Sequence, residues 1–166
     1  MYKLDQHLDD WLKGFGASNV IYCAFGNECV LELNQFQELL LGLELTGRPF
    51  LAALNPPMNC KTLESALPQG FAHRTRGRVI IHEDWVQQQQ QLILQHPSLG
   101  CFITDCGETC LSEAIITKCQ VVLMPLAIDQ YINARMMSLE WNIGVEVEKR
   151  LSDGFSLRRP SSRRSP

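Results

Sequence analysis

Short apolar runs that alternate with helix-like segments are the feature that most limits how this chain can fold. Five such runs, bounded by turn residues, are separated by stretches with helical spacing, and a shorter sixth run follows. Runs of this kind are typical of buried parallel strands, which need a crossover between them. The sequence therefore predicts an α/β protein with a doubly wound, Rossmann-like parallel sheet covered on both faces. The predicted strands cover residues 19–25, 49–54, 79–82, 100–104, 120–124 and 143–147.

Helix signals lie between the predicted strands. Asn34 and Gln37 have a spacing like that of a capping box, and Gly47 suits the C′ position that ends a helix. Thr109 is the predicted N-cap of a helix after the fourth strand, because apolar residues recur behind it at helical spacing. Further helices are predicted around residues 63–67, through the glutamine run to residue 94, and over residues 129–141.

The turn after the fourth strand has the layout of an anion site. A strand, a glycine-containing loop at residues 105–109 and a helix start follow one another there. The unpaired N–H groups and the positive end of the helix dipole at such a point favour phosphate. Ligands of doubly wound sheets bind beyond the carboxyl ends of the strands. We therefore expect the ligand to meet the loops at residues 26–27, 82–88, 105–109 and 125–130.

Composition narrows the functional class. The chain has 166 residues, a hydrophobic content of 45% and a formal net charge of −3, so one globular domain is expected and nucleic acid is not an expected partner. No apolar run reaches the roughly 18 residues of a membrane span, and no signal peptide is recognised. We expect a cytoplasmic protein. Its seven cysteines are an odd number, which favours reduced thiols.

Residues 85–130 resemble the signature box of plant family 1 UDP-dependent glycosyltransferases. The box begins Trp-Val-Gln-Gln at residue 85, continues His-Pro-Ser-Leu-Gly-Cys-Phe-Ile-Thr from residue 96, and ends Pro-Leu-x-x-Asp-Gln at residue 130. The segments CAFGNE, ALPQGF and GRVI also resemble the subgroup that adds a sugar to flavonoid or anthocyanin glycosides. The resemblance extends over almost all of residues 11–149.

This resemblance implies the C-terminal, nucleotide-sugar-binding half of an inverting GT-B enzyme. Its catalytic base and acceptor pocket are expected in an N-terminal domain that this sequence does not contain, and the UDP-sugar is a substrate rather than a cofactor. The resemblance implies a linker-like segment at residues 1–18 and the binding domain at 19–150. Residues 151–166 are rich in Arg, Ser and Pro without apolar periodicity, so they are predicted to be a disordered tail.

The resemblance also implies roles for individual residues. Trp85 would stack on uracil, the Val86 backbone would bond the base edge, and Gln88 and Glu113 would bind the ribose hydroxyls. Asp129 and Gln130 would hold the sugar. The residues implied around the diphosphate are Gly26, Asn27, Asp105, Gly107, Thr109 and Cys110.

Several residues depart from the family pattern. Asp105 stands where the family has a histidine, Glu108 replaces an aromatic residue, and two extra glutamines follow Trp85. An ionised carboxylate about 4 Å from a phosphate would weaken binding by roughly a thousandfold. The alternative is that Asp105 points into a hydrogen-bonded turn and never meets the phosphates.

The sequence is therefore compatible with two functions. One is transfer of a sugar from a UDP-sugar to a small-molecule hydroxyl. The other is a truncated or degenerate domain that binds a nucleotide sugar or a partner without catalysis. A zinc site at Asp105, Cys106 and Cys110 is disfavoured, because no second cysteine pair accompanies them.

Overall fold

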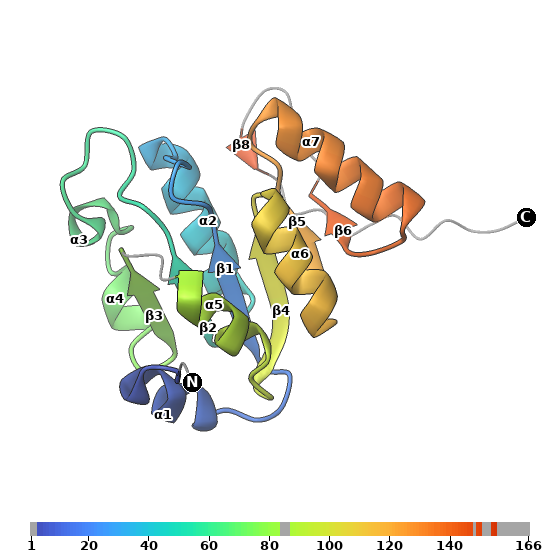
Figure 1. Ribbon diagram of the computed structural model, residues 1–166. Coiled ribbons are helices and arrows are strands. Elements are labelled where there is room, and N and C mark those ends of the chain that lie inside the picture. Colours follow the sequence, from blue (N-terminus) through green and yellow to red (C-terminus); the bar gives the residue numbers. More distant parts are fainter. Residues whose placement is uncertain (1–2, 84–86, 148, 151–153, 156–166) are drawn as a thin grey trace, which may run out of the picture.

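The computed structural model describes residues 3–83, 87–147, 149–150 and 154–155. Its centre is a six-stranded sheet with the order β3-β2-β1-β4-β5-β6, in which every neighbouring pair is parallel (Figure 1). This confirms the predicted doubly wound sheet. The strands are β1 Val20–Ala24, β2 Phe50–Ala53, β3 Val79–His82, β4 Leu99–Thr104, β5 Val121–Leu123 and β6 Val145–Glu146.

Helices cover both faces of the sheet, and each face has its own apolar cluster. The apolar side chains of β1, β2, β3 and β5 alternate between the two clusters, as the pleat requires. Helices α1, α5, α6 and α7 contribute to one cluster, and α2, α3 and α4 contribute to the other. The helices are α1 Gln6–Lys13, α2 Leu33–Leu45, α3 Leu63–Ala66, α4 Phe71–Arg74, α5 Gln87–Leu94, α6 Glu108–Thr117 and α7 Ile128–Arg135, which continues into the π-helical turn η1 Met136–Glu140.

The first of these clusters contains an aromatic pair on the two central strands. Tyr22 of β1 and Phe102 of β4 stack with ring centroids 5.3 Å apart and ring planes 14° apart. Both side chains are buried. The pair fixes the packing of the two strands whose following loops build the site described below.

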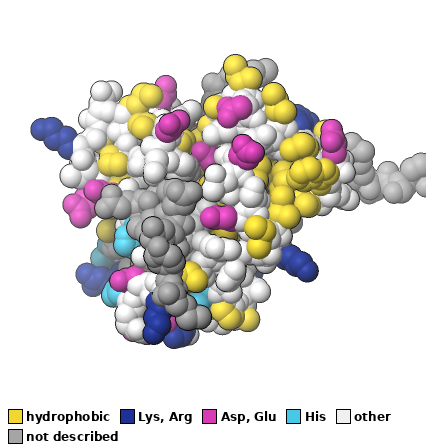
Figure 2. Space-filling model, viewed as in Figure 1, with side chains coloured by type: hydrophobic (Ala, Val, Ile, Leu, Met, Phe, Trp, Pro, Cys, Tyr) yellow, Lys and Arg dark blue, Asp and Glu magenta, His cyan; other side chains and the backbone are white. Residues whose placement is uncertain are grey.

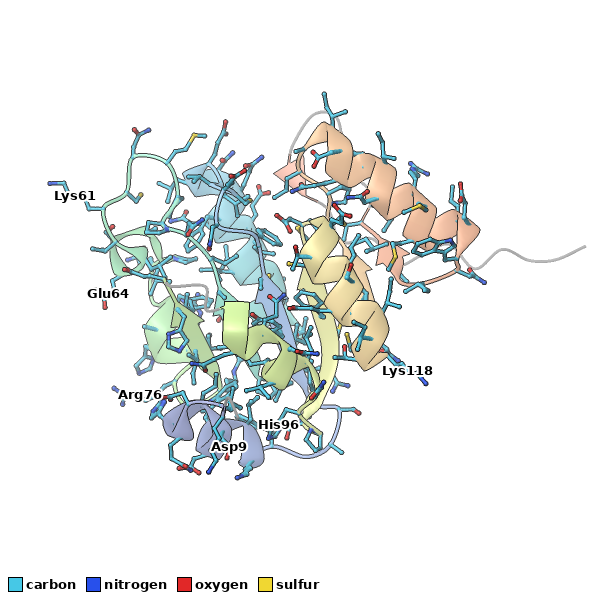
Figure 3. The ribbon with its side chains drawn as sticks, viewed as in Figure 1. Asp9, Lys61, Glu64, Arg76, His96 and Lys118 are labelled. Atoms are coloured by element: carbon cyan, nitrogen blue, oxygen red, sulfur yellow. The ribbon has the colours of Figure 1, made fainter. Side chains whose placement is uncertain are left out.

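Helix α1 lies inside the segment that was expected to be linker-like. Its side chains Leu8 and Leu12 are buried in the first cluster. Ser98 Oγ donates a hydrogen bond to Leu12 O (2.8 Å), and His96 Nε2 lies 3.7 Å from Asp9 Oδ1 (Figure 3). Residues 6–13 therefore pack against the domain, whereas the domain boundaries at residues 18 and 150 stay predictions.

Two predicted helix starts were wrong by two residues each. Helix α2 begins after Glu32 rather than at Asn34, and the Gln35 side chain accepts a hydrogen bond from the Glu32 N–H (3.2 Å). Helix α6 has Gly107, not Thr109, as its N-cap. The predicted end of α2 was correct, since Gly47 follows the helix with a φ of +68°, a value that glycine adopts readily.

A two-stranded sheet lies near the end of the chain, and the disordered tail over residues 151–166 stays a prediction. Strand β8, Gly154–Phe155, lies in the segment that was expected to be disordered, and it pairs antiparallel with β7, Lys149–Arg150. Among the residues that the structure describes, no helix is long and apolar enough to cross a membrane.

Candidate functional site

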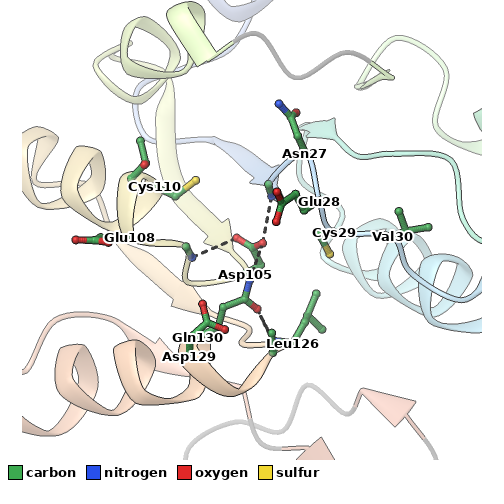
Figure 4. Close-up of a pocket in the computed structure, with 14 residues that line it drawn as sticks. Asn27, Glu28, Cys29, Val30, Asp105, Glu108, Cys110, Leu126, Asp129 and Gln130 are labelled. Atoms are coloured by element: carbon green, nitrogen blue, oxygen red, sulfur yellow. Dashed lines mark hydrogen bonds between the residues drawn. The ribbon is translucent and has the colours of Figure 1, made fainter.

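A cavity of about 600 Å³ opens beyond the carboxyl ends of β1, β4 and β5 (Figure 4). This volume is within the usual range for small-molecule sites. Three loops form the cavity, and they come from residues 26–30, 105–110 and 126–130. The predicted site residues that line it are Gly26, Asn27, Asp105, Gly107, Thr109, Cys110, Asp129 and Gln130.

Asp105 ties the three loops together. Its side chain is only 2% exposed. Oδ2 accepts hydrogen bonds from Gly26 N (3.1 Å) and from Gln130 Nε2 (3.1 Å), and Oδ1 accepts one from Gly107 N (3.4 Å). Figure 4 shows the carboxylate between the loops that carry these donors. The hydrogen-bonded turn considered for Asp105 is therefore present, although the residue also borders the cavity.

Gln130 is held by the protein at both ends of its amide. Nε2 donates to Asp105, while Oε1 accepts from Leu126 N (2.8 Å) and Ala127 N (2.9 Å). The side chain thereby caps the start of α7 and connects it to the loop after β4. Its neighbour Asp129 is exposed and lines the same cavity, and the contact of both residues with the sugar stays a prediction.

The start of α6 supplies the free backbone donors of the cavity. The first backbone bond of this helix runs from Leu111 N to Gly107 O (3.0 Å). The N–H groups of Glu108, Thr109 and Cys110 therefore have no acceptor within the helix, and they lie at the positive end of its dipole. The strand, loop and helix start that the sequence predicted are therefore present, and the binding of an anion there stays a prediction.

A left-handed residue shapes the turn before this helix. Cys106 has a φ of +70°, which is uncommon for a residue with a side chain. Its N–H donates to Thr104 Oγ1 (3.2 Å), and its carbonyl accepts from Asn133 Nδ2 (3.1 Å). These bonds hold the chain reversal that brings Gly107 N toward Asp105.

Glu113 lies one helical turn behind the cavity and has a partner that the sequence analysis missed. Gln90 Nε2 donates to Glu113 Oε2 (2.6 Å), and Tyr22 Oη donates to Gln90 Oε1 (3.3 Å). Gln90 is buried, and it is the glutamine of the run whose contact with Glu113 the structure records. Five identical glutamines form this run, so the sequence pattern alone does not single out Gln90.

Three predicted residues cannot be compared with the structure in full. Trp85 and Val86 lie outside the described residues. The backbone of Gln88 belongs to α5, but its side chain is not described. Their roles stay predictions.

The described lining of the cavity is acidic. It contains Glu28, Glu108 and Asp129, which are exposed, and the buried Asp105, but it contains no lysine, arginine or histidine. Figure 2 shows several acidic side chains over the upper part of the molecule in this view, with Lys and Arg side chains mostly toward its margins. Among the described residues of this lining, the carboxylates are opposed by the positive end of the α6 dipole and by no cationic side chain.

The cavity also contains thiols that stay protonated. Burial, and then the charge of Asp105, raise the pKa of Cys29 to about 12, and burial raises the pKa of Cys110. Neither is therefore a thiolate nucleophile at neutral pH. No group of three His, Cys, Asp or Glu side chains is placed to hold a metal within the described part of the chain.

Comparison with known proteins places this architecture among plant transferases. The chain is 62% identical over 145 residues to a cyanidin 3-O-galactoside 2″-O-xylosyltransferase of Actinidia chinensis, covering 87% of this chain and 31% of that protein. It is 54% identical over 151 residues to an anthocyanidin 3-O-glucoside 2″-O-glucosyltransferase of Ipomoea nil, covering 91% and 32%. The chain thus spans about a third of the length of these relatives.

Solved structures agree with the sequence relatives. The fold matches a Phytolacca americana glycosyltransferase, UGT2, with a TM-score of 0.81 at 25% identity, covering 93% of this chain and 36% of that one. It matches a Siraitia grosvenorii transferase in complex with UDP with a TM-score of 0.78 at 26% identity, covering 89% and 36%. These matches confirm the predicted fold, the C-terminal half of a GT-B glycosyltransferase.

One sequence family accounts for nearly the whole of this domain. The family described as "UDP-glucoronosyl and UDP-glucosyl transferase" matches residues 3–154, which include all six strands of the sheet and all three loops of the cavity. The chain belongs to this family of UDP-sugar transferases.

Proposed function

We propose that this chain is the donor-binding half of a UDP-glycosyltransferase that transfers a sugar from a UDP-sugar to a hydroxyl of a flavonoid or anthocyanin glycoside in the cytoplasm. The observation that carries the proposal is the cavity where the loops after β1, β4 and β5 converge, in a chain of this family. Two relatives named for acting on anthocyanin-type glycosides and a structural neighbour in complex with UDP support the same ligand class.

The proposed arrangement follows the cavity from α5 to α7. Trp85 stacks on uracil, and Glu113, oriented by Gln90, binds the ribose. The start of α6 faces the diphosphate through the N–H groups of Thr109 and Cys110, and Asp129 contacts the sugar.

In the transfer step an acceptor hydroxyl oxygen bonds to the anomeric carbon while the bond from that carbon to the β-phosphate oxygen breaks. The hydroxyl proton passes to a base on an acceptor domain, and the departing UDP takes the electron pair. The dipole of α6 stabilises the negative charge that develops on the leaving oxygen.

Base selectivity tests the proposed nucleotide site. We expect UDP to bind at least about tenfold more tightly than ADP, because the two ligands share the same diphosphate and only uracil would match the base-edge hydrogen bond predicted at the Val86 backbone. A polar group left unpaired by the wrong base costs about 1–3 kcal/mol. Isothermal titration calorimetry measures both affinities. Trp85→Ala should remove most of the UDP affinity, whereas Trp141→Ala, a control at an exposed tryptophan outside the cavity, should leave it unchanged. Equal affinities for UDP and ADP in the parent protein would contradict the assignment.

Sugar transfer by the 166-residue polypeptide alone is the second test. We expect no product above a boiled control when it is incubated with UDP-glucose and a flavonoid glycoside, since no residue of this chain is assigned as the base. Chromatography with mass detection gives the readout. Addition of the N-terminal half of an active relative is the positive arm, and turnover by the polypeptide alone would show that it holds its own base.

A non-catalytic donor-binding domain is the second candidate function. The acidic lining of the cavity favours it, because four carboxylates and no described cation face the space where a diphosphate would lie. Measurable UDP binding together with no transfer in the positive arm would support this candidate over the enzyme.

A further inference from the structure

We infer that the Asp105 carboxylate takes the position of a bound phosphate, so that this site selects uridine compounds through base and ribose and gains little affinity from their phosphates. The inference rests on the proposed function, because it concerns the same cavity. It adds a specificity determinant, and it predicts which part of the donor the chain recognises.

First, hydrogen-bond donors that could bind a phosphate are already bonded to Asp105. Gly26 N, Gly107 N and Gln130 Nε2 come from three different loops and all donate to one buried carboxylate. Backbone and amide N–H groups that converge in this way at a loop edge are the donors that phosphate oxygens normally use. In this chain an internal anion has already engaged them.

The second support is the charge of the lining. Besides Asp105, the cavity has Glu28, Glu108 and Asp129, and no lysine, arginine or histidine is among its described lining residues. At an effective dielectric of about 20, one carboxylate about 6 Å from a negative charge on the ligand lowers the affinity for that ligand roughly a hundredfold. The start of α6 favours an anion by only about twofold to fivefold at an exposed site. Repulsion therefore outweighs the remaining attraction.

The third support is the separation of the two ends of the site. Glu113 and Gln90, which are assigned to the ribose, bond each other at 2.6 Å, and neither lines the acidic cavity. The nucleoside contacts can therefore remain intact while the phosphate contacts are lost. Asp105 acts on the phosphates through its charge and by occupying their donors.

A series of ligands that differ only in phosphate content tests the inference. Uridine, UMP and UDP are titrated calorimetrically into the full 166-residue chain at one pH and one salt concentration. We expect that neither UMP nor UDP binds more than about threefold more tightly than uridine, because repulsion by the carboxylates offsets any gain from the phosphates. In Asp105→Asn, whose amide oxygen still accepts from Gly26 N and Gln130, UDP should gain about tenfold while uridine changes by less than twofold.

Glu28→Gln is the matched control, because it removes one carboxylate from the same lining at an exposed position that makes none of the three loop contacts. It should raise UDP affinity by less than about threefold. The parent ligand series needs no variant, so the test survives if Asp105→Asn does not fold.

The outcomes separate the two claims. UDP binding tenfold or more above uridine in the parent chain overturns the inference and leaves the proposed function intact. An equal gain for uridine and UDP in Asp105→Asn also overturns it, since the residue then acts on the fold alone. No binding of either ligand overturns the proposed function itself.

Discussion

Phe102→Ala is expected to lower the free energy of unfolding by about 4 kcal/mol, the range observed when a fully buried aromatic side chain is removed. Phe102 lies on β4, one of the two central strands, and its side chain is 0% exposed. Alanine loses the transfer free energy of the ring and the stack on Tyr22, and it leaves a cavity that the rigid sheet cannot close. Urea denaturation followed by circular dichroism measures the loss.

Two control variants show how much of this loss comes from the missing ring. Phe102→Leu keeps most of the buried volume and should cost about 1–2 kcal/mol. Ile132→Ala truncates a side chain that is 66% exposed on α7 and should cost less than about 0.5 kcal/mol. A loss below about 1.5 kcal/mol for Phe102→Ala would mean that this face of the sheet is not packed as described.

The sheet could be predicted because each of its strands is a short apolar run in the sequence. All six predicted strands are present, and each contains the observed strand or overlaps it closely. Helix α1 was not predicted, although Leu8, Trp11 and Leu12 have helical spacing, because polar and charged residues separate them. Its burial depends on contacts with residues 96–98, which are distant in sequence.

The location of the cavity could be predicted because ligands of doubly wound sheets bind beyond the carboxyl ends of the strands, and because the family resemblance pointed to the same loops. The loops at residues 26–27, 105–109 and 125–130 do converge, because β1, β4 and β5 are neighbours and end at the same edge. The direction of the side chains could not be predicted in the same way. Asp105 and Gln130 are 25 residues apart, and no local pattern indicates that they bond each other.

Gln90 illustrates a second limit. Five consecutive glutamines are identical as sequence, so spacing from Trp85 cannot decide which of them reaches the ribose site. Only the rotation of α5 on the sheet brings Gln90 to Glu113 and Tyr22. Tertiary packing therefore decides which glutamine contacts Glu113, and this cannot be predicted from the pattern of residue types.

Asp105→Ala is the second substitution with a large expected effect, because it leaves three donors from three loops without their acceptor. Hydrogen bonds to a charged group contribute about 1.5–3 kcal/mol each, but bonds that share one acceptor group are not additive. We expect a loss of about 3–5 kcal/mol in the free energy of unfolding, because each donor left without an acceptor costs about 1–3 kcal/mol. Thermal and urea unfolding measure it.

Graded variants distinguish this role from a surface charge effect. Asp105→Asn keeps the acceptor of the two shorter bonds and should lose only about 1–2 kcal/mol, while Asp129→Ala, at an exposed carboxylate of the same cavity, should lose less than about 0.5 kcal/mol. Amide hydrogen exchange at Gly26 and Gly107 provides a local readout, because both N–H groups should lose protection in Asp105→Ala. If Asp105→Ala were as stable as the parent, the carboxylate would have to face the cavity in solution. It would then repel a diphosphate directly instead of engaging the donors that a phosphate needs.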